Sequence, residues 1–110
     1  MRSTPVSIAI IRPKQPYIKW ANSLPDRDRE YTEDVFKKDC LTLLVPKYTD
    51  EKEALEHINK IWQDIFNEEL HRWSPNQAWY PKDMTQKNFS QWFDVEFQAE
   101  VFDSIKYAKN

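Results

Sequence analysis

The stretch Asp50–Trp73, DEKEALEHINKIWQDIFNEELHRW, decides the fold because it carries the clearest periodic pattern in the chain. Its apolar side chains recur every three or four residues, which places them on one face of an α-helix. Asp50 with Glu53 resembles a capping box at a helix start, and Ser74-Pro75 is typical of a stop. About 22 residues predict a helix some 33 Å long. The expected buried face comprises Ala54, Leu55, Ile58, Ile61, Trp62, Ile65, Phe66, Leu70 and Trp73.

Three stretches on either side of this helix predict β-strands. Val6–Arg12 has apolar residues on both faces, which is typical of a central strand or one covered on more than one side. Cys40–Val45 is nearly all apolar and is followed by Pro46. Phe93–Val101 alternates apolar with acidic or polar side chains, which predicts a half-buried strand with its acidic side in water.

Shorter patterns predict three brief helices, beginning near Pro16, near Thr32 and near Thr85 or Asp83. A charged loop, Asp26–Glu30, separates the first two. This order predicts one α+β domain over residues 1–110. We expect a small mixed β-sheet of about three strands, packed in two layers against one long helix and two or three short helices.

The composition excludes several classes of site. The chain has 110 residues, 40% hydrophobic and 31% charged, and it contains no glycine. Phosphate-binding P-loops, dinucleotide G-x-G-x-x-G turns and G-x-S-x-G nucleophile elbows need glycine, so none is present. The single Cys40 excludes an intrachain disulfide and a cysteine zinc cluster. We therefore expect no cofactor, and the sequence leans away from an enzyme.

The net charge of −2 gives no reason to expect nucleic acid as a partner. A weaker alternative is nucleic-acid binding by the basic first 25 residues, with Tyr17 and Trp20 as stacking side chains. The start does not resemble a signal peptide, and no apolar run approaches the length of a spanning helix. We expect a cytoplasmic protein with no membrane contact.

The titratable side chains suggest no strong catalytic or metal site. Asp94, Glu96 and Glu100 share one strand face, where paired carboxylates serve acid–base chemistry or bind a cation, but any solvated strand face looks the same. His57 and His71 are about 21 Å apart on one helix, so they cannot share a metal. Cys40 is expected to be a small buried hydrophobe.

Two groups of residues are candidates for binding. Trp79 and Tyr80 lie in a proline-bounded loop, where they either anchor a partner or cap the long helix by packing on Phe66 or Trp73. Arg12 and Lys14 follow the first strand, and Lys47 follows the second.

Strands joined through a helical connection are expected to be parallel, which would gather the three cations beside the helix start near Pro16 as an anion site. The alternative is that they form ordinary surface ion pairs with Asp94 or Asp26.

Arg12-Pro13-Lys14-Gln15-Pro16-Tyr17 and Trp92-Phe93-Asp94-Val95-Glu96-Phe97 resemble stretches of a group of small uncharacterised bacterial proteins. The resemblance implies a bacterial cytoplasmic protein and carries no catalytic residue. Because no glycine loop, metal cluster or catalytic triad is present, we predict a binding or regulatory module acting through protein–protein contact. The alternative is a small enzyme or anion-binding domain that uses Arg12, Lys14 and Lys47.

Overall fold

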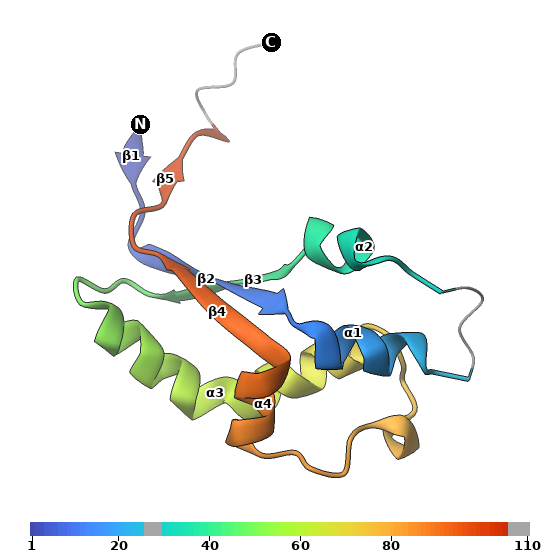
Figure 1. The fold of residues 1–110 in the computed structure, drawn as a ribbon. Coiled ribbons are helices and arrows are strands. Elements are labelled where there is room, and N and C mark those ends of the chain that lie inside the picture. The colour runs from blue at the N-terminus through green and yellow to red at the C-terminus, as the bar shows by residue number, and fades with distance from the viewer. Residues whose placement is uncertain (26–29, 106–110) are drawn as a thin grey trace.

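The computed structural model of the protein describes residues 1–25 and 30–105. At its centre is a three-stranded sheet in the order β3-β2-β4 (Figure 1). The strands are β2 (Val6–Pro13), β3 (Leu41–Pro46) and β4 (Phe93–Gln98). The predicted α+β class is confirmed. Every strand pair in the described residues is antiparallel, however, so the expectation of a mixed sheet is wrong.

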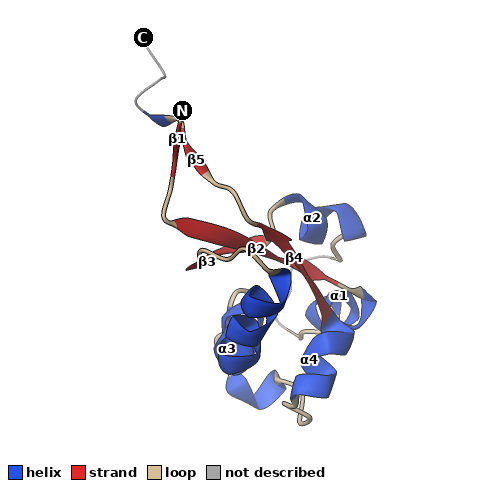
Figure 2. Ribbon diagram, turned by 90° about the vertical axis from the view of Figure 1, so that its left-hand side faces the viewer, coloured by secondary structure: helices blue, strands red, loops and turns tan. Residues whose placement is uncertain are grey.

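The long helix α3 (Glu51–His71) lies with α4 (Gln86–Trp92) on one side of this sheet (Figure 2). Asp50 caps α3, because its side chain accepts a hydrogen bond from the backbone N–H of Lys52 at 3.0 Å. The remaining helices are α1 (Gln15–Asn22), α2 (Glu33–Lys38) and the short 3-10 helix η1 (Gln77–Trp79). The predicted loop Asp26–Glu30 lies outside the described residues except for Glu30.

The core forms between the buried face of α3 and the inner face of β2. Phe66 is fully buried and its ring contacts three others, those of Phe89, Trp92 and Phe93. Much of the predicted face of α3 is buried, namely Ala54, Ile58, Ile65, Phe66 and Leu70.

The prediction for the rest of that face is only partly right. Ile61 and Trp62 are half-buried, and Leu55 is 49% exposed. The exposure of Leu55 follows from the position of α4, whose first residue Gln86 hydrogen-bonds Asn59 of α3. Leu55 lies one turn before Asn59 and is therefore beyond the end of α4.

The direction of β3 follows from where the chain turns. Leu41 pairs with Ile11, so β3 starts at the same end of the sheet at which β2 stops. The intervening helices α1 and α2 return the chain at that end instead of carrying it across the sheet (Figure 1). The crossover is made by α3 instead, because β3 and β4 both run antiparallel to β2 and hence in the same direction.

A second, two-stranded ribbon projects from the sheet (Figures 1 and 2). It pairs β1 (Arg2–Ser3) with β5 (Phe102–Asp103). The predicted strand Phe93–Val101 is therefore divided, with β4 ending at Gln98. Between the two sheets the buried hydroxyl of Ser7 donates a hydrogen bond of 2.7 Å to the carbonyl of Ala99.

Candidate functional site

The predicted cluster of three cations does not exist. Arg12 pairs in register with Asp94 at one end of the sheet, whereas Pro46 pairs with Val6 at the other. Lys47 follows Pro46, so it lies at the opposite end of the sheet from Arg12 and Lys14. The prediction failed because β2 and β3 are antiparallel, which separates their carboxyl ends by the length of the sheet.

Each of these cations instead has an acidic partner, either on the polar side of β4 or, for Lys47, just after β4. Lys14 Nζ lies 3.3 Å from the Asp94 carboxylate, and Lys47 Nζ lies 3.2 Å from that of Glu100. Arg12 Nε donates to Glu96 at 2.9 Å, and this hydrogen bond raises the Arg12 pKa.

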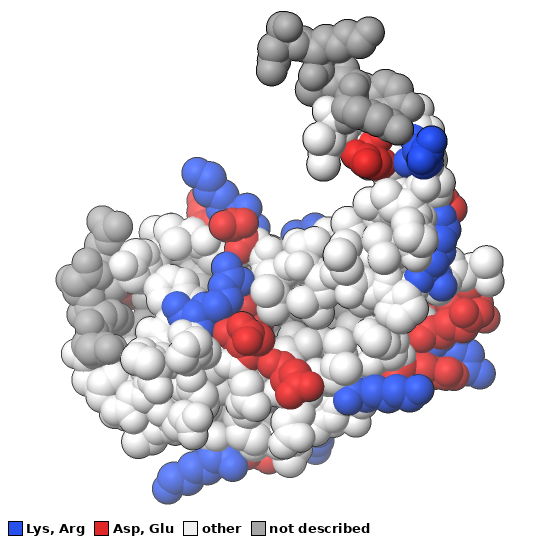
Figure 3. All heavy atoms as spheres, turned by 180° about the vertical axis from the view of Figure 1, so that it is seen from behind, with Lys and Arg blue, Asp and Glu red and all other residues white. Residues whose placement is uncertain are grey.

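On the side of the molecule seen in Figure 3, basic and acidic side chains also lie next to one another. The predicted alternative, surface ion pairs, is found for Lys14 and Asp94. The same pairs occupy the three carboxylates that the sequence offered for acid–base chemistry.

The other titratable candidates also stay apart. In the described part of the chain, no three His, Cys, Asp or Glu side chains gather closely enough to hold a metal ion. Cys40 is only partly buried, which corrects the expectation of a buried side chain. The physical reason is that β3 begins at Leu41, so Cys40 lies in the turn after α2 and outside the sheet.

The loop that carries Trp79 and Tyr80 is held in place by hydrogen bonds. The Tyr80 hydroxyl donates to the Ser74 carbonyl at 2.8 Å, and the indole N–H of Trp20 donates to the Trp79 carbonyl at 2.8 Å. Asn76 accepts from the backbone N–H of Ala78 at 3.0 Å. Both predicted anchors are half-buried. Tyr80 packs on Trp20, with ring centroids 6.1 Å apart, and it also packs against the buried core cluster to which Phe66 belongs.

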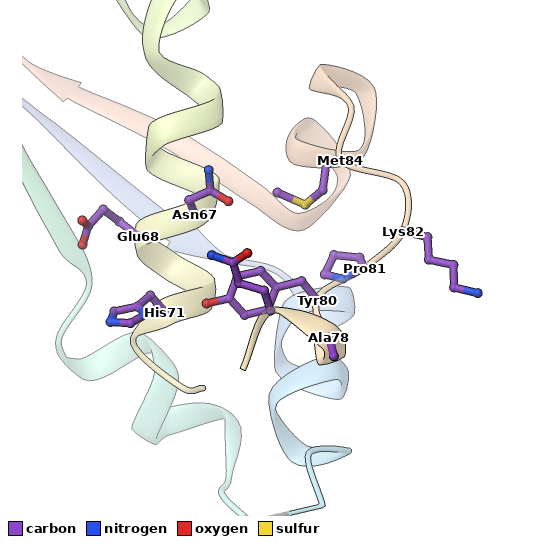
Figure 4. Close-up of a pocket in the computed structure, with 9 residues that line it drawn as sticks. Asn67, Glu68, His71, Ala78, Tyr80, Pro81, Lys82 and Met84 are labelled. Carbon is purple, nitrogen blue, oxygen red and sulfur yellow. The ribbon is translucent and has the colours of Figure 1, made fainter. Parts of the chain in front are cut away.

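This loop forms one wall of an open groove of about 630 Å³ (Figure 4). The C-terminal half of α3 forms the other wall. The Tyr80 ring extends from the loop toward α3, and the side chains of Pro81 and Met84 continue the apolar surface beside it. Trp79 does not line the groove; its contribution is the carbonyl that Trp20 binds. The lining residues are Asn67, Glu68, His71, Gln77, Ala78, Tyr80, Pro81, Lys82 and Met84.

The charges on the groove lie on opposite sides of Tyr80. Glu68 and His71 project from α3, and Lys82 lies beyond Pro81 (Figure 4). Neither Glu68 nor Lys82 forms an ion pair with any residue that the structure describes. The groove therefore offers a carboxylate, an ammonium and an aromatic surface at fixed places, and all three are open to solvent or only half-buried.

Tyr80 is predictable as a candidate from the sequence, but the groove is not. The two walls of the groove are separated in sequence by the turn at Ser74-Pro75, which the sequence marks only as the end of a helix. The sequence offers His71 only as a possible metal ligand, and it gives no separate reason to single out Glu68. The available signal was the amphipathic pattern of α3, which places both residues on the face away from the sheet.

A second polar feature lies in the interior near the end of α3. The Glu69 side chain is 2% exposed, and Arg72 Nη1 lies 2.9 Å from its Oε1. Burial raises the pKa of Glu69, and this effect outweighs the opposing hydrogen bond and charge of Arg72. Arg72 Nη2 also donates to the Asp39 carbonyl at 3.1 Å. These contacts join the end of α3 to the turn before β3.

Comparison of the chain with models of protein families, with curated proteins and with solved structures finds no match in any of the three. No helix within residues 1–25 and 30–105 has the length and hydrophobicity needed to cross a membrane.

Proposed function

We propose that the protein is a protein-binding module whose groove holds an extended segment of a partner protein. The observation that carries this proposal is the groove between α3 and the loop around Tyr80. The Tyr80 side chain is held in place by its hydrogen bond to the Ser74 carbonyl and by the ring of Trp20. A surface that is already ordered loses little conformational entropy when it binds, which favours affinity.

The lining of the groove has the chemistry that a peptide requires. Its volume of about 630 Å³ suits a short stretch of side chains. Tyr80 and Met84 offer an aromatic face and a thioether, both of which adapt well to apolar side chains. The amides of Asn67 and Gln77 each donate and accept hydrogen bonds, as a peptide backbone does.

The charges of Glu68 and Lys82, which form no ion pair with any described residue, specify the partner segment further. Lys82 favours an acidic side chain at its end of the groove, and Glu68 favours a basic side chain at the other. We propose a partner segment with an apolar centre and opposite charges on either side of it. The resemblance to bacterial proteins supports a cytoplasmic setting, which stays a prediction.

The enzyme or anion-site alternative has lost its basis, because it required Lys47 beside Arg12 and Lys14. Each of those cations now has a carboxylate partner. No second function is proposed.

The experiment is selection from a displayed library of random peptides on the intact protein. We expect recovered peptides to combine apolar residues with one acidic and one basic residue, and to shift the NMR signals of residues 67–84. Lys82→Glu should weaken their binding severalfold. Lys52→Glu is the matched control, because it makes the same charge change at an exposed site on the first turn of α3. Peptides that bind with undisturbed signals in residues 67–84 would refute the proposal.

A further inference from the structure

The two outer edges of the sheet differ in how they are protected. In the described residues β3 and β4 each pair with β2 alone, so each has one free edge. A free edge invites pairing with another strand, and natural proteins discourage it with charged side chains. β4 follows that rule, since Asp94 and Glu96 are charged and exposed.

β3 does not follow it. Its sequence, Leu41-Thr42-Leu43-Leu44-Val45-Pro46, contains no charged residue. Leu44 is 71% exposed, and it pairs in register with Ile8, which is only half-buried. An edge with an exposed leucine and no charge is suited to strand addition.

We propose that β3 pairs with β3 of a second copy of this chain, antiparallel and centred on Leu43, to form one continuous six-stranded sheet across a two-fold axis. This register pairs every residue from Leu41 to Val45. It places Thr42 of one copy opposite Leu44 of the other, and Leu41 opposite Val45. The strand is self-complementary, as a two-fold interface requires, because inward-facing aliphatic residues meet each other and Leu44 gains a neighbour.

The chain enters and leaves β3 through charged segments. A two-fold antiparallel pairing brings the segment before β3 in one copy close to the segment after β3 in the other. Lys38 ends α2 just before β3 and is exposed, whereas Asp50 and Glu51 follow β3 at the start of α3 and are also exposed. The pairing therefore brings the exposed Lys38 of each copy toward acidic residues of the other. This complementarity, rather than exposure alone, identifies the occupant as a second copy.

The pairing uses none of the groove residues 67–84, so the dimer proposal and the groove proposal can be refuted independently of each other.

The test is sedimentation equilibrium of the full chain over a concentration series. We expect a reversible monomer–dimer equilibrium. The variant Thr42→Lys with Leu44→Lys should be monomeric, because each lysine would lie directly opposite another across the two-fold axis. The variant Thr42→Glu with Leu44→Lys should dimerise again, because the opposed charges are then unlike.

A matched control adds two lysines elsewhere, at Leu55 and Gln63, which are both exposed on α3. Leu55→Lys with Gln63→Lys should dimerise like the parent. Circular dichroism of all variants checks that the fold is retained. The proposal is overturned if the parent is monomeric throughout the series. It is also overturned if the two-lysine β3 variant stays dimeric while folded, or if the charge-matched variant associates no better than it.

Discussion

The Glu69 carboxylate in the last turn of α3 lies 2.9 Å from the guanidinium of Arg72, the residue that follows the helix, and the Glu69 side chain is only 2% exposed. The two members of the pair are not equally buried, because the Arg72 side chain is 38% exposed. Arg72 therefore brings a solvated charge to a carboxylate that water barely reaches.

Replacing one partner should have a different effect from replacing the other. Arg72→Ala leaves the Glu69 carboxylate buried without its donor, and we expect a loss of about 1–3 kcal/mol in unfolding free energy. Glu69→Gln removes the buried charge and leaves Arg72 in contact with water, so its cost should be smaller. Urea denaturation of both variants measures this difference. Equal losses of unfolding free energy would show that the hydrogen bond between the two side chains, and not the buried charge of Glu69, determines the cost.

The stability of the protein should depend on the ionisation of Glu69. Burial raises its pKa above the ordinary value of 4.5, so the folded state binds this proton more tightly than the unfolded chain does. The stabilisation from Glu69 is therefore complete below that ordinary value and is lost as the pH rises through the raised pKa.

Glu69→Gln removes this contribution. The difference in unfolding free energy between variant and parent should shift in favour of Glu69→Gln as the pH rises from about 4 to about 7. Taking the difference cancels the carboxylates whose pKa is lowered, such as Glu100 with its hydrogen bonds from Ser3 and Lys47. A difference that does not change with pH would contradict the raised pKa.

The core of α3 should tolerate truncation unevenly. Phe66→Ala removes a fully buried ring that contacts three others, and we expect it to cost about 3–5 kcal/mol. Trp62→Ala should cost less, because Trp62 is half-buried and has Phe89 as its ring neighbour. Thermal or urea unfolding compares the two. A larger loss for Trp62→Ala would mean that α3 is turned relative to the sheet.

The periodic elements were predictable because their signal is local. The three-and-four spacing from Asp50 gave α3 nearly its observed bounds, and the alternation after Phe93 placed the acidic residues on the exposed side of β4. The direction of β3 was not predictable in this way. A connection that contains helices can cross the sheet or return at the same end. Here Tyr17 of α1 packs on Phe36 of α2, a contact between two helices that the local pattern of neither helix specifies.

The groove was less accessible to sequence reasoning than the strands and helices. Tyr80 was a candidate because a large aromatic residue stood between prolines, but its partner Trp20 lies far away in the chain. Glu69 did have a signal, since it follows Ile65 and Phe66 at helical spacing on the apolar face. A charged residue at such a position usually marks the boundary of the buried face, but Glu69 lies inside that face.

The loop around Tyr80 should loosen when its tie to α1 is cut. Trp20→Phe keeps an aromatic ring at this position but leaves the Trp79 carbonyl without the indole N–H. We expect a loss of about 1 kcal/mol in unfolding free energy and faster amide hydrogen exchange at Tyr80. Exchange in the middle of α3 should be unchanged. Unchanged protection at Tyr80 would show that the Ser74 hydrogen bond alone holds the loop.

The central claim is that the groove beside Tyr80 binds a partner segment through its two free charges. Its most direct test is a double-mutant cycle by calorimetry on a peptide recovered by selection. The cycle pairs Lys82→Glu in the protein with replacement of the acidic residue of the peptide by lysine. The account predicts that either change alone weakens binding severalfold and that the two together restore a large part of the affinity. Independent losses, which leave the doubly changed pair weakest of all, would contradict it.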